Sequence, residues 1–128
     1  MKIISLNPDT WQAGRGYRKN RLLSASELKQ PGALLQLVSV PPGSSIPPHA
    51  HHTSIEVYVV TRGECVLEVD GRTSVMRPGD IILMEPGDVH ALANRGEEPF
   101  ELLVFKTNAT EGDVVWDSKS GPLSAPEG

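Results

Sequence analysis

The chain has very little cysteine. Cys65 is the single cysteine among 128 residues, so an internal disulfide bond is impossible. The start of the chain also lacks a basic segment followed by an apolar one, the pattern that marks secretion. Both features favour a reducing compartment, and the predicted location is the cytoplasm.

Long apolar runs and an excess of one charge are also missing. The apolar stretches cover only a few residues, whereas a membrane-spanning helix needs about 20. The formal net charge is −4, with both signs spread along the chain. This balance argues against nucleic acid or an anionic membrane as the main partner. Small molecules and other protein subunits remain as partner classes.

Glycine and proline, by contrast, are plentiful. Twelve glycines and eleven prolines recur between short apolar runs, a pattern typical of many short strands joined by tight turns. The sequence therefore predicts an all-β fold. The predicted strands are Ala33–Val40, Ile55–Thr61, Glu64–Asp70, Arg72–Met76, Asp80–Met84, His90–Asn94 and Phe100–Thr107.

Two local signals refine this prediction. The pair Asp70-Gly71 separates two alternating runs and predicts a β-hairpin, because a type I′ turn needs positive φ at both central residues. Two proline clusters, Pro41-Pro42 and Pro47-Pro48, lack donor N–H groups and are disfavoured inside a sheet. They predict a loop that leads into the histidines.

The histidines form a candidate metal site. In an extended segment side chains alternate, so His49 and His51 face one side and His52 the other. Glu56 begins the next predicted strand, and His90 begins a distant one that we expect to pair nearby. Three imidazole nitrogens and one carboxylate oxygen suit Fe, Mn, Ni, Cu, Co or Zn.

The spacing of these residues resembles a known family. The pattern Gly43-x5-His49-x-His51-x4-Glu56-x6-Gly63 matches the first motif of the cupins at every fixed position. The second motif is present as Gly79-x5-Glu85-x-Gly87-x2-His90-x3-Asn94, with Glu85 where the family usually has proline.

The resemblance implies a double-stranded β-helix, or jelly-roll barrel, that holds one divalent metal ion through His49, His51, Glu56 and His90. It also implies that the motif glycines lie at turns with positive φ or close backbone approach. The organisation then predicted is an N-terminal arm (residues 1–30), a β-barrel domain (31–108) and a flexible C-terminal tail (109–128).

Two functions remain open at this point. One is a metal-dependent enzyme on a small molecule, since cupins that look like this chain include dioxygenases, decarboxylases and isomerases. The other is a non-catalytic metal-containing protein that binds a sugar or a carboxylate, because a fold does not determine a function. For the enzyme, Glu56 and Tyr58 are the candidate catalytic residues, and Gln36 and Ser39 are further candidate polar groups inside the barrel.

Other polar residues have simpler interpretations. Tyr58 is alternatively barrel core. Asn94 is expected to close a turn through bonds to the backbone, and Cys65 to be an inert structural thiol. A basic cluster, Arg15, Arg18, Lys19 and Arg21, suggests either a site for an acidic ligand or a solvated arm.

The assembly predicted from the sequence is a homodimer. Tyr17, Leu22 and Leu23 of the arm have no obvious partner in a small barrel, and two-fold assemblies are the commonest. Val57 and Val59, on an outward strand face, would supply an apolar contact layer. If the arm instead folds back on its own barrel, a monomer results.

Overall fold

The computed structural model describes residues 1–116. It confirms the all-β prediction, and the seven predicted strands are present with bounds that differ by no more than one residue. The elements are η1 (Pro8–Thr10), β1 (Gln12–Ala13), β2 (Arg18–Leu23), α1 (Ala25–Leu28), β3 (Leu34–Val40), β4 (Ser45–His51), β5 (Ile55–Arg62), β6 (Cys65–Val69), β7 (Arg72–Met76), β8 (Ile81–Met84), β9 (His90–Ala93), β10 (Phe100–Thr107) and β11 (Val114–Trp116).

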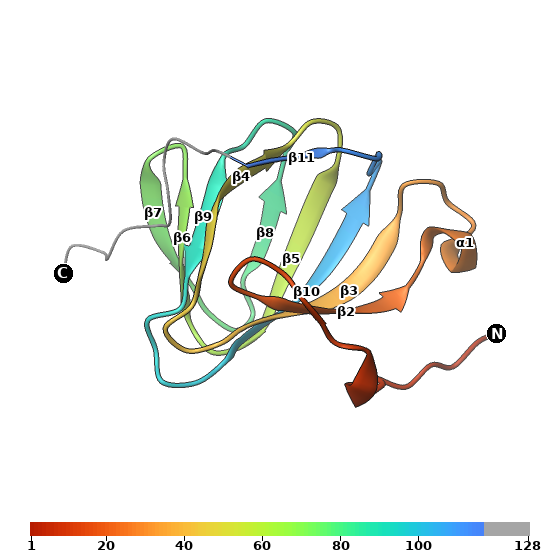
Figure 1. Ribbon diagram of the computed structural model, residues 1–128, viewed down its shortest axis with the longest axis horizontal. Helices are drawn as coiled ribbons and strands as arrows, with labels where there is room; N and C mark the ends of the chain where they lie inside the picture. Colours follow the sequence, from red (N-terminus) through yellow and green to blue (C-terminus); the bar gives the residue numbers. More distant parts are fainter. Residues whose placement is uncertain (117–128) are drawn as a thin grey trace.

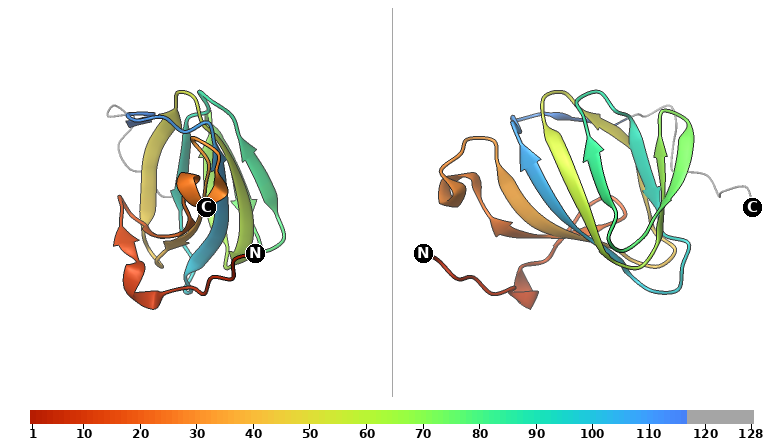
Figure 2. Two further views of the ribbon diagram at one scale, coloured as in Figure 1. Left: turned by 90° about the vertical axis from the view of Figure 1, so that its right-hand side faces the viewer. Right: turned by 180° about the vertical axis from the view of Figure 1, so that it is seen from behind.

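The strands form two sheets that face each other (Figures 1 and 2). The first sheet has the order β1-β2-β3-β10-β5-β8, and the second has the order β11-β4-β9-β6-β7. All their pairings are antiparallel. Within residues 1–116 the ladders join strands only inside each sheet, so the expected barrel is not closed. Covalent connections such as those from β4 to β5 and from β9 to β10 cross between the layers instead.

The core lies between the sheets. Phe100, Leu102 and Val104 alternate along β10 and are almost fully buried, and they pack with Met76 and Leu92 from the second sheet. Burial of large apolar side chains at about 25 cal/mol per Å² is the main stabilising term for such a sandwich.

The predicted hairpin is confirmed. β6 and β7 pair around Asp70 and Gly71, whose φ angles are 49° and 83°. The motif glycines also have positive φ. At Gly63 a Cβ atom would lie 2.5 Å from the Pro99 carbonyl oxygen, so close backbone approach excludes a side chain there.

The predicted proline loop is wrong. Pro47 and Pro48 lie inside β4, which pairs with β9 and β11. The sheet tolerates them because the register with β9 shifts between Ile46 and His49, while β11 pairs only with residues 49–51. The two missing N–H groups therefore fall where the ladder is interrupted.

The N-terminal residues add to the first sheet. β2 pairs with β3, and Tyr17 packs against the core, so this part of the arm folds back on its own chain. In Figure 1 the segment before β1 is drawn in red and runs below β2.

The C-terminal end of the described chain forms a strand that was not predicted. β11 joins the edge of the second sheet. Residues 117–128 of the predicted tail lie outside the described residues. No helix in the described part is long and apolar enough to cross a membrane.

Candidate metal centre

The second sheet brings three of the four predicted ligands together. His49 lies opposite His90 in the β4–β9 pairing, and one ring nitrogen from each of His49, His51 and His90 lies within 4.8 Å of the others. All three side chains are buried. His52 is exposed, as the alternation of side chains predicts.

An extra residue in β4 aims the histidines. Between Ile46 and His49 the chain advances three residues while β9 advances two, from Leu92 to His90. Without this bulge, Ile46 and His49 would point to opposite faces. With it, Ile46 packs in the core and His49 and His51 reach the same interior.

Hydrogen bonds fix two of the rings. Nδ1 of His49 lies 2.9 Å from the Pro47 carbonyl oxygen, and Nδ1 of His90 lies 2.9 Å from that of Asp88. A carbonyl only accepts, so each Nδ1 carries the proton and each Nε2 presents a lone pair. This is the tautomer that a metal-binding histidine needs.

His51 is held by a residue that the sequence did not single out. Its Nδ1 lies 3.5 Å from Oδ2 of buried Asp113. Burial would raise the pKa of Asp113, but the neighbouring Ser54 hydroxyl and two hydrogen bonds from Thr53 hold that pKa well below its usual range. Asp113 is 60 residues from Thr53 in the chain, so no local pattern indicates it.

Glu56 comes from the opposite sheet. Its Oε1 lies 2.6 Å from His51 Nε2 and 3.7 Å from His90 Nε2, and its Oε2 lies 3.7 Å from Lys106 Nζ. Burial acts to raise the pKa of Glu56, but His51 and Lys106 outweigh it and lower the pKa to about 2. Glu56 is therefore an anion at neutral pH.

The imidazoles of His49 and His90 have lowered pKa values. Burial, with the nearby His90 ring, lowers the pKa of His49 to about 4, and burial also lowers the pKa of His90. Both rings are neutral at pH 7, as ligation requires. Both ring nitrogens of His51 are buried, and each lies near a carboxylate: Nε2 is 2.6 Å from Glu56 Oε1, and Nδ1 is 3.5 Å from Asp113 Oδ2. Three buried imidazoles that converge beside the Glu56 carboxylate fit a divalent metal ion.

Tyr58 completes this face of the first sheet. Its hydroxyl lies 3.4 Å from Glu56 Oε1 and 3.2 Å from His90 Nε2. Burial, reinforced by the charge of Glu56, raises the pKa of Tyr58 well above its ordinary value. The phenol therefore stays protonated and can donate a hydrogen bond.

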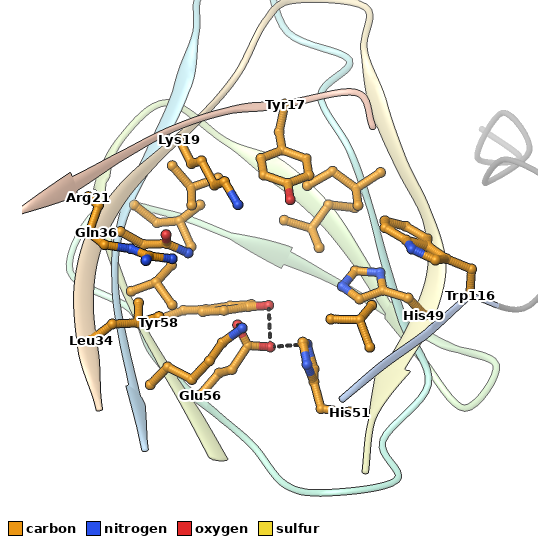
Figure 3. Close-up of a pocket in the computed structure, with 17 residues that line it drawn as sticks. Tyr17, Lys19, Arg21, Leu34, Gln36, His49, His51, Glu56, Tyr58 and Trp116 are labelled. Carbon is orange, nitrogen blue, oxygen red and sulfur yellow. Dashed lines mark hydrogen bonds and ion pairs between the residues drawn. The ribbon is translucent and has the colours of Figure 1, made fainter. Parts of the chain in front are cut away.

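A cavity between the sheets is lined by His49, His51, Glu56 and Tyr58, among other residues (Figure 3). Its volume is about 140 Å³, close to the roughly 150 Å³ of an engineered cavity that holds benzene. Gln36 lines it as predicted. Ser39, three residues further along β3, lies on the opposite face and does not line it, because side chains three apart in a regular strand point to opposite sides.

The interpretations of Asn94 and Cys65 agree with the structure. The Asn94 amide donates to the carbonyls of Val40 and Glu98 and accepts from Gly96 N–H, which closes the turn after β9. Burial raises the pKa of Cys65 to about 12, as expected of a structural thiol.

The fold and the site define a double-stranded β-helix protein with a buried group of three histidines. A family model described as "Cupin domain" matches residues 36–106, which is more than half of the chain. The protein belongs to the cupin family.

Several known proteins are similar to this chain. An oxalate-binding protein of Thermotoga maritima is 30% identical over 82 residues, which cover 64% of this chain and 68% of that protein. Germin-like protein 5-1 of Oryza sativa is 34% identical over 91 residues, which cover 66% of this chain but 40% of the relative. The polyketide cyclase RemF from Streptomyces resistomycificus has a TM-score of 0.77 at 23% identity and covers 94% of this chain and 89% of its own. At that identity the likeness shows the fold alone.

Proposed function

We propose that the protein is a metal-dependent enzyme that acts on a small organic molecule, with one divalent ion held by His49, His51, His90 and Glu56. The observation that carries the proposal is the set of three buried imidazoles converging beside the ionised carboxylate of Glu56. Three nitrogens and one oxygen suit Fe, Mn, Ni, Cu, Co or Zn. When bound, such an ion supplies a Lewis acid or an oxygen-binding centre.

Glu56 and Tyr58 are the proposed catalytic residues. As an anion, Glu56 either stays a ligand or takes a proton from a bound enol, hydroxyl or water. The Tyr58 hydroxyl, 3.4 Å from Glu56 Oε1, donates to a substrate oxygen and holds it beside that carboxylate. A carboxylate and a phenol hydroxyl side by side in the cavity favour acid–base chemistry over a purely structural site.

The second candidate is a non-catalytic protein that binds a metal-held carboxylate. It is supported by the Thermotoga maritima relative, which is called an oxalate-binding protein. Both candidates require the same metal ligands, so metal binding alone does not distinguish them. They differ in turnover, which only the enzyme has.

The test begins with metal analysis of protein purified without added metal, followed by oxygen-uptake screening with catechols, diketones and thiols. The enzyme proposal expects turnover of at least one compound, and it expects Tyr58→Phe, which removes no proposed metal ligand, to lower the rate while the metal stays bound. A metal-loaded protein that binds a carboxylate and returns it unchanged would overturn the enzyme proposal and support the second candidate.

We also propose a homodimer in the cytoplasm. The outer face of the first sheet carries Ile81 and Leu83, which are 71% and 58% exposed, beside the outward-facing Val57 and Val59. An apolar strip on a sheet surface is typical of a sheet-to-sheet contact. The free thiol of Cys65 is consistent with a reducing compartment.

A further inference from the structure

The basic cluster of the N-terminal segment is divided by the alternation of β2. Lys19 and Arg21 line the cavity, and Figure 3 shows their side chains on the wall opposite His49 and Trp116. Arg18, which directly precedes Lys19 in the strand, faces the other way, and its guanidinium lies 5.2 Å from the centre of the Trp11 ring. Two cations of the basic cluster, Lys19 and Arg21, therefore line the cavity.

A third cation joins them from β10. Lys106 lines the same cavity and lies opposite Glu56 in the sheet. Burial lowers the pKa of Lys19, and the charges of Arg21 and Lys106 lower it further, because the three cations face one another. Among the residues that line the cavity, these three positive charges meet one carboxylate, that of Glu56. The cavity thus has an excess of positive charge before any metal ion is bound.

Gln36 supplies an independent sign of a ligand. It lies directly opposite Arg21 in the β2–β3 pairing, is 8% exposed and lines the cavity. Its Oε1 is buried and has no hydrogen-bond partner. An unpaired buried acceptor is costly, and a donor on a bound molecule would satisfy it.

We propose that the wall formed by Lys19, Arg21, Gln36 and Lys106 is the subsite for the carboxylate of an organic substrate that also carries a hydroxyl group. The cations bind the carboxylate, and Arg21 can do so through two parallel N–H bonds. Gln36 Oε1 accepts a hydrogen bond from the hydroxyl group. The substrate is organic because leucine and valine side chains line much of the remaining cavity, and it is small because the cavity is about benzene-sized.

The substrate role of this subsite rests on the proposed function, whereas the binding of the anion is measured separately. The test uses isothermal titration calorimetry on the full chain with malate, with succinate, which lacks only the hydroxyl, and with inorganic phosphate. Metal content is measured for every variant. A failed metal analysis with intact malate binding would overturn the proposed function and leave the subsite standing.

The decisive variants are Lys19→Gln and Arg21→Gln, with Arg18→Gln as the matched control. The control removes the same charge from the same strand on the opposite face. Loss of a charge-assisted hydrogen bond predicts at least a tenfold weaker malate affinity for the first two variants and less than a twofold change for the control. Unchanged metal content would show that the anion contact itself was lost. Equal weakening in all three variants, or phosphate bound more tightly than malate, would overturn the proposal.

Gln36→Leu tests the hydroxyl contact. The wild-type protein should bind malate more tightly than succinate, and Gln36→Leu should bring the two affinities together. A preference for malate that survives in Gln36→Leu would contradict the role of Gln36. Arg21 is exposed, so the comparison of Arg21→Gln with Arg18→Gln decides the anion proposal even if replacement of the more buried Lys19 impairs folding.

Discussion

At the scale of single residues, the site depends on groups that hold each imidazole in one state. Backbone carbonyls of Pro47 and Asp88 accept from Nδ1 of His49 and His90, which leaves the opposite nitrogens free. Burial then keeps the rings neutral, at the cost of making their protonation unfavourable. That cost has a measurable consequence for the stability of the metal-free protein.

The pKa of His49 is about 4 in the fold, against an ordinary value of 6.5. Between these values the unfolded chain binds a proton that the folded chain does not, so the free energy of unfolding falls as pH falls from about 6.5 to 4. At about 1.4 kcal/mol per pKa unit, His49 alone contributes a loss of about 3 kcal/mol. Urea unfolding of the metal-free protein at pH 7 and pH 4.5 measures it.

His49→Gln is the comparison for this prediction. The variant should lose less stability between the two pH values, and His90, whose pKa is also lowered, accounts for part of what remains. Glu56 does not confuse the measurement, because its stabilising effect is present above about pH 4.5 and is lost only as pH falls toward 2. An identical loss in wild type and variant would contradict the assignment.

Among the elements, seven of the eleven strands in the described residues could be predicted from the sequence, whereas β1, β2, β4 and β11 could not. Alternating apolar runs and turn residues indicate β3, β5 to β8, β9 and β10 because each has one face in the core. Pro47 and Pro48 argue against a strand at β4, because a proline has no N–H group to donate. Only the pairing with β9 shows that the missing N–H groups fall at a bulge. Motif spacing indicated the candidate ligands, whereas Asp113 and the cavity-facing side of β2 depend on contacts between distant segments.

The bulge in β4 makes a prediction of its own. Deleting Pro48 removes the extra residue and should turn either Ile46 or the pair His49 and His51 away from the interior. We expect a loss of metal binding of at least tenfold. Pro48→Ala keeps the residue count and should retain the metal. Metal content of the two purified variants, compared by mass spectrometry, tests this, and full retention by the deletion variant would refute the role of the bulge.

In the whole molecule, the two faces of the first sheet differ in composition: the inner face is polar where it lines the cavity, and the outer face exposes apolar side chains. The inner face carries Glu56, Tyr58 and the cationic wall, and the outer face exposes Ile81 and Leu83. The sequence indicated an apolar outer strip through Val57 and Val59, but it placed the argument for a dimer on an N-terminal arm that pairs with its own β3. The outer strip is now the better support for assembly.

Leu83→Glu tests the dimer without touching the cavity. A charge in a sheet-to-sheet contact would be buried without a partner, so the variant should be monomeric at micromolar concentration while its metal content is unchanged. Arg72→Glu, on an exposed part of β7 in the other sheet, is the control and should remain dimeric. Light scattering that reports a single chain mass for the wild-type protein would rule the dimer out.

The metal ion is tested most directly by the metal content of protein purified without added metal. We predict about one divalent transition-metal ion per chain in wild type and in His52→Ala, whose side chain is exposed. We predict at least a tenfold lower content in His51→Ala and His90→Ala, both checked for a folded β structure by circular dichroism. Folded His51→Ala and His90→Ala proteins with a full metal complement, or a wild-type protein that neither contains nor takes up such an ion, would contradict the proposed metal site.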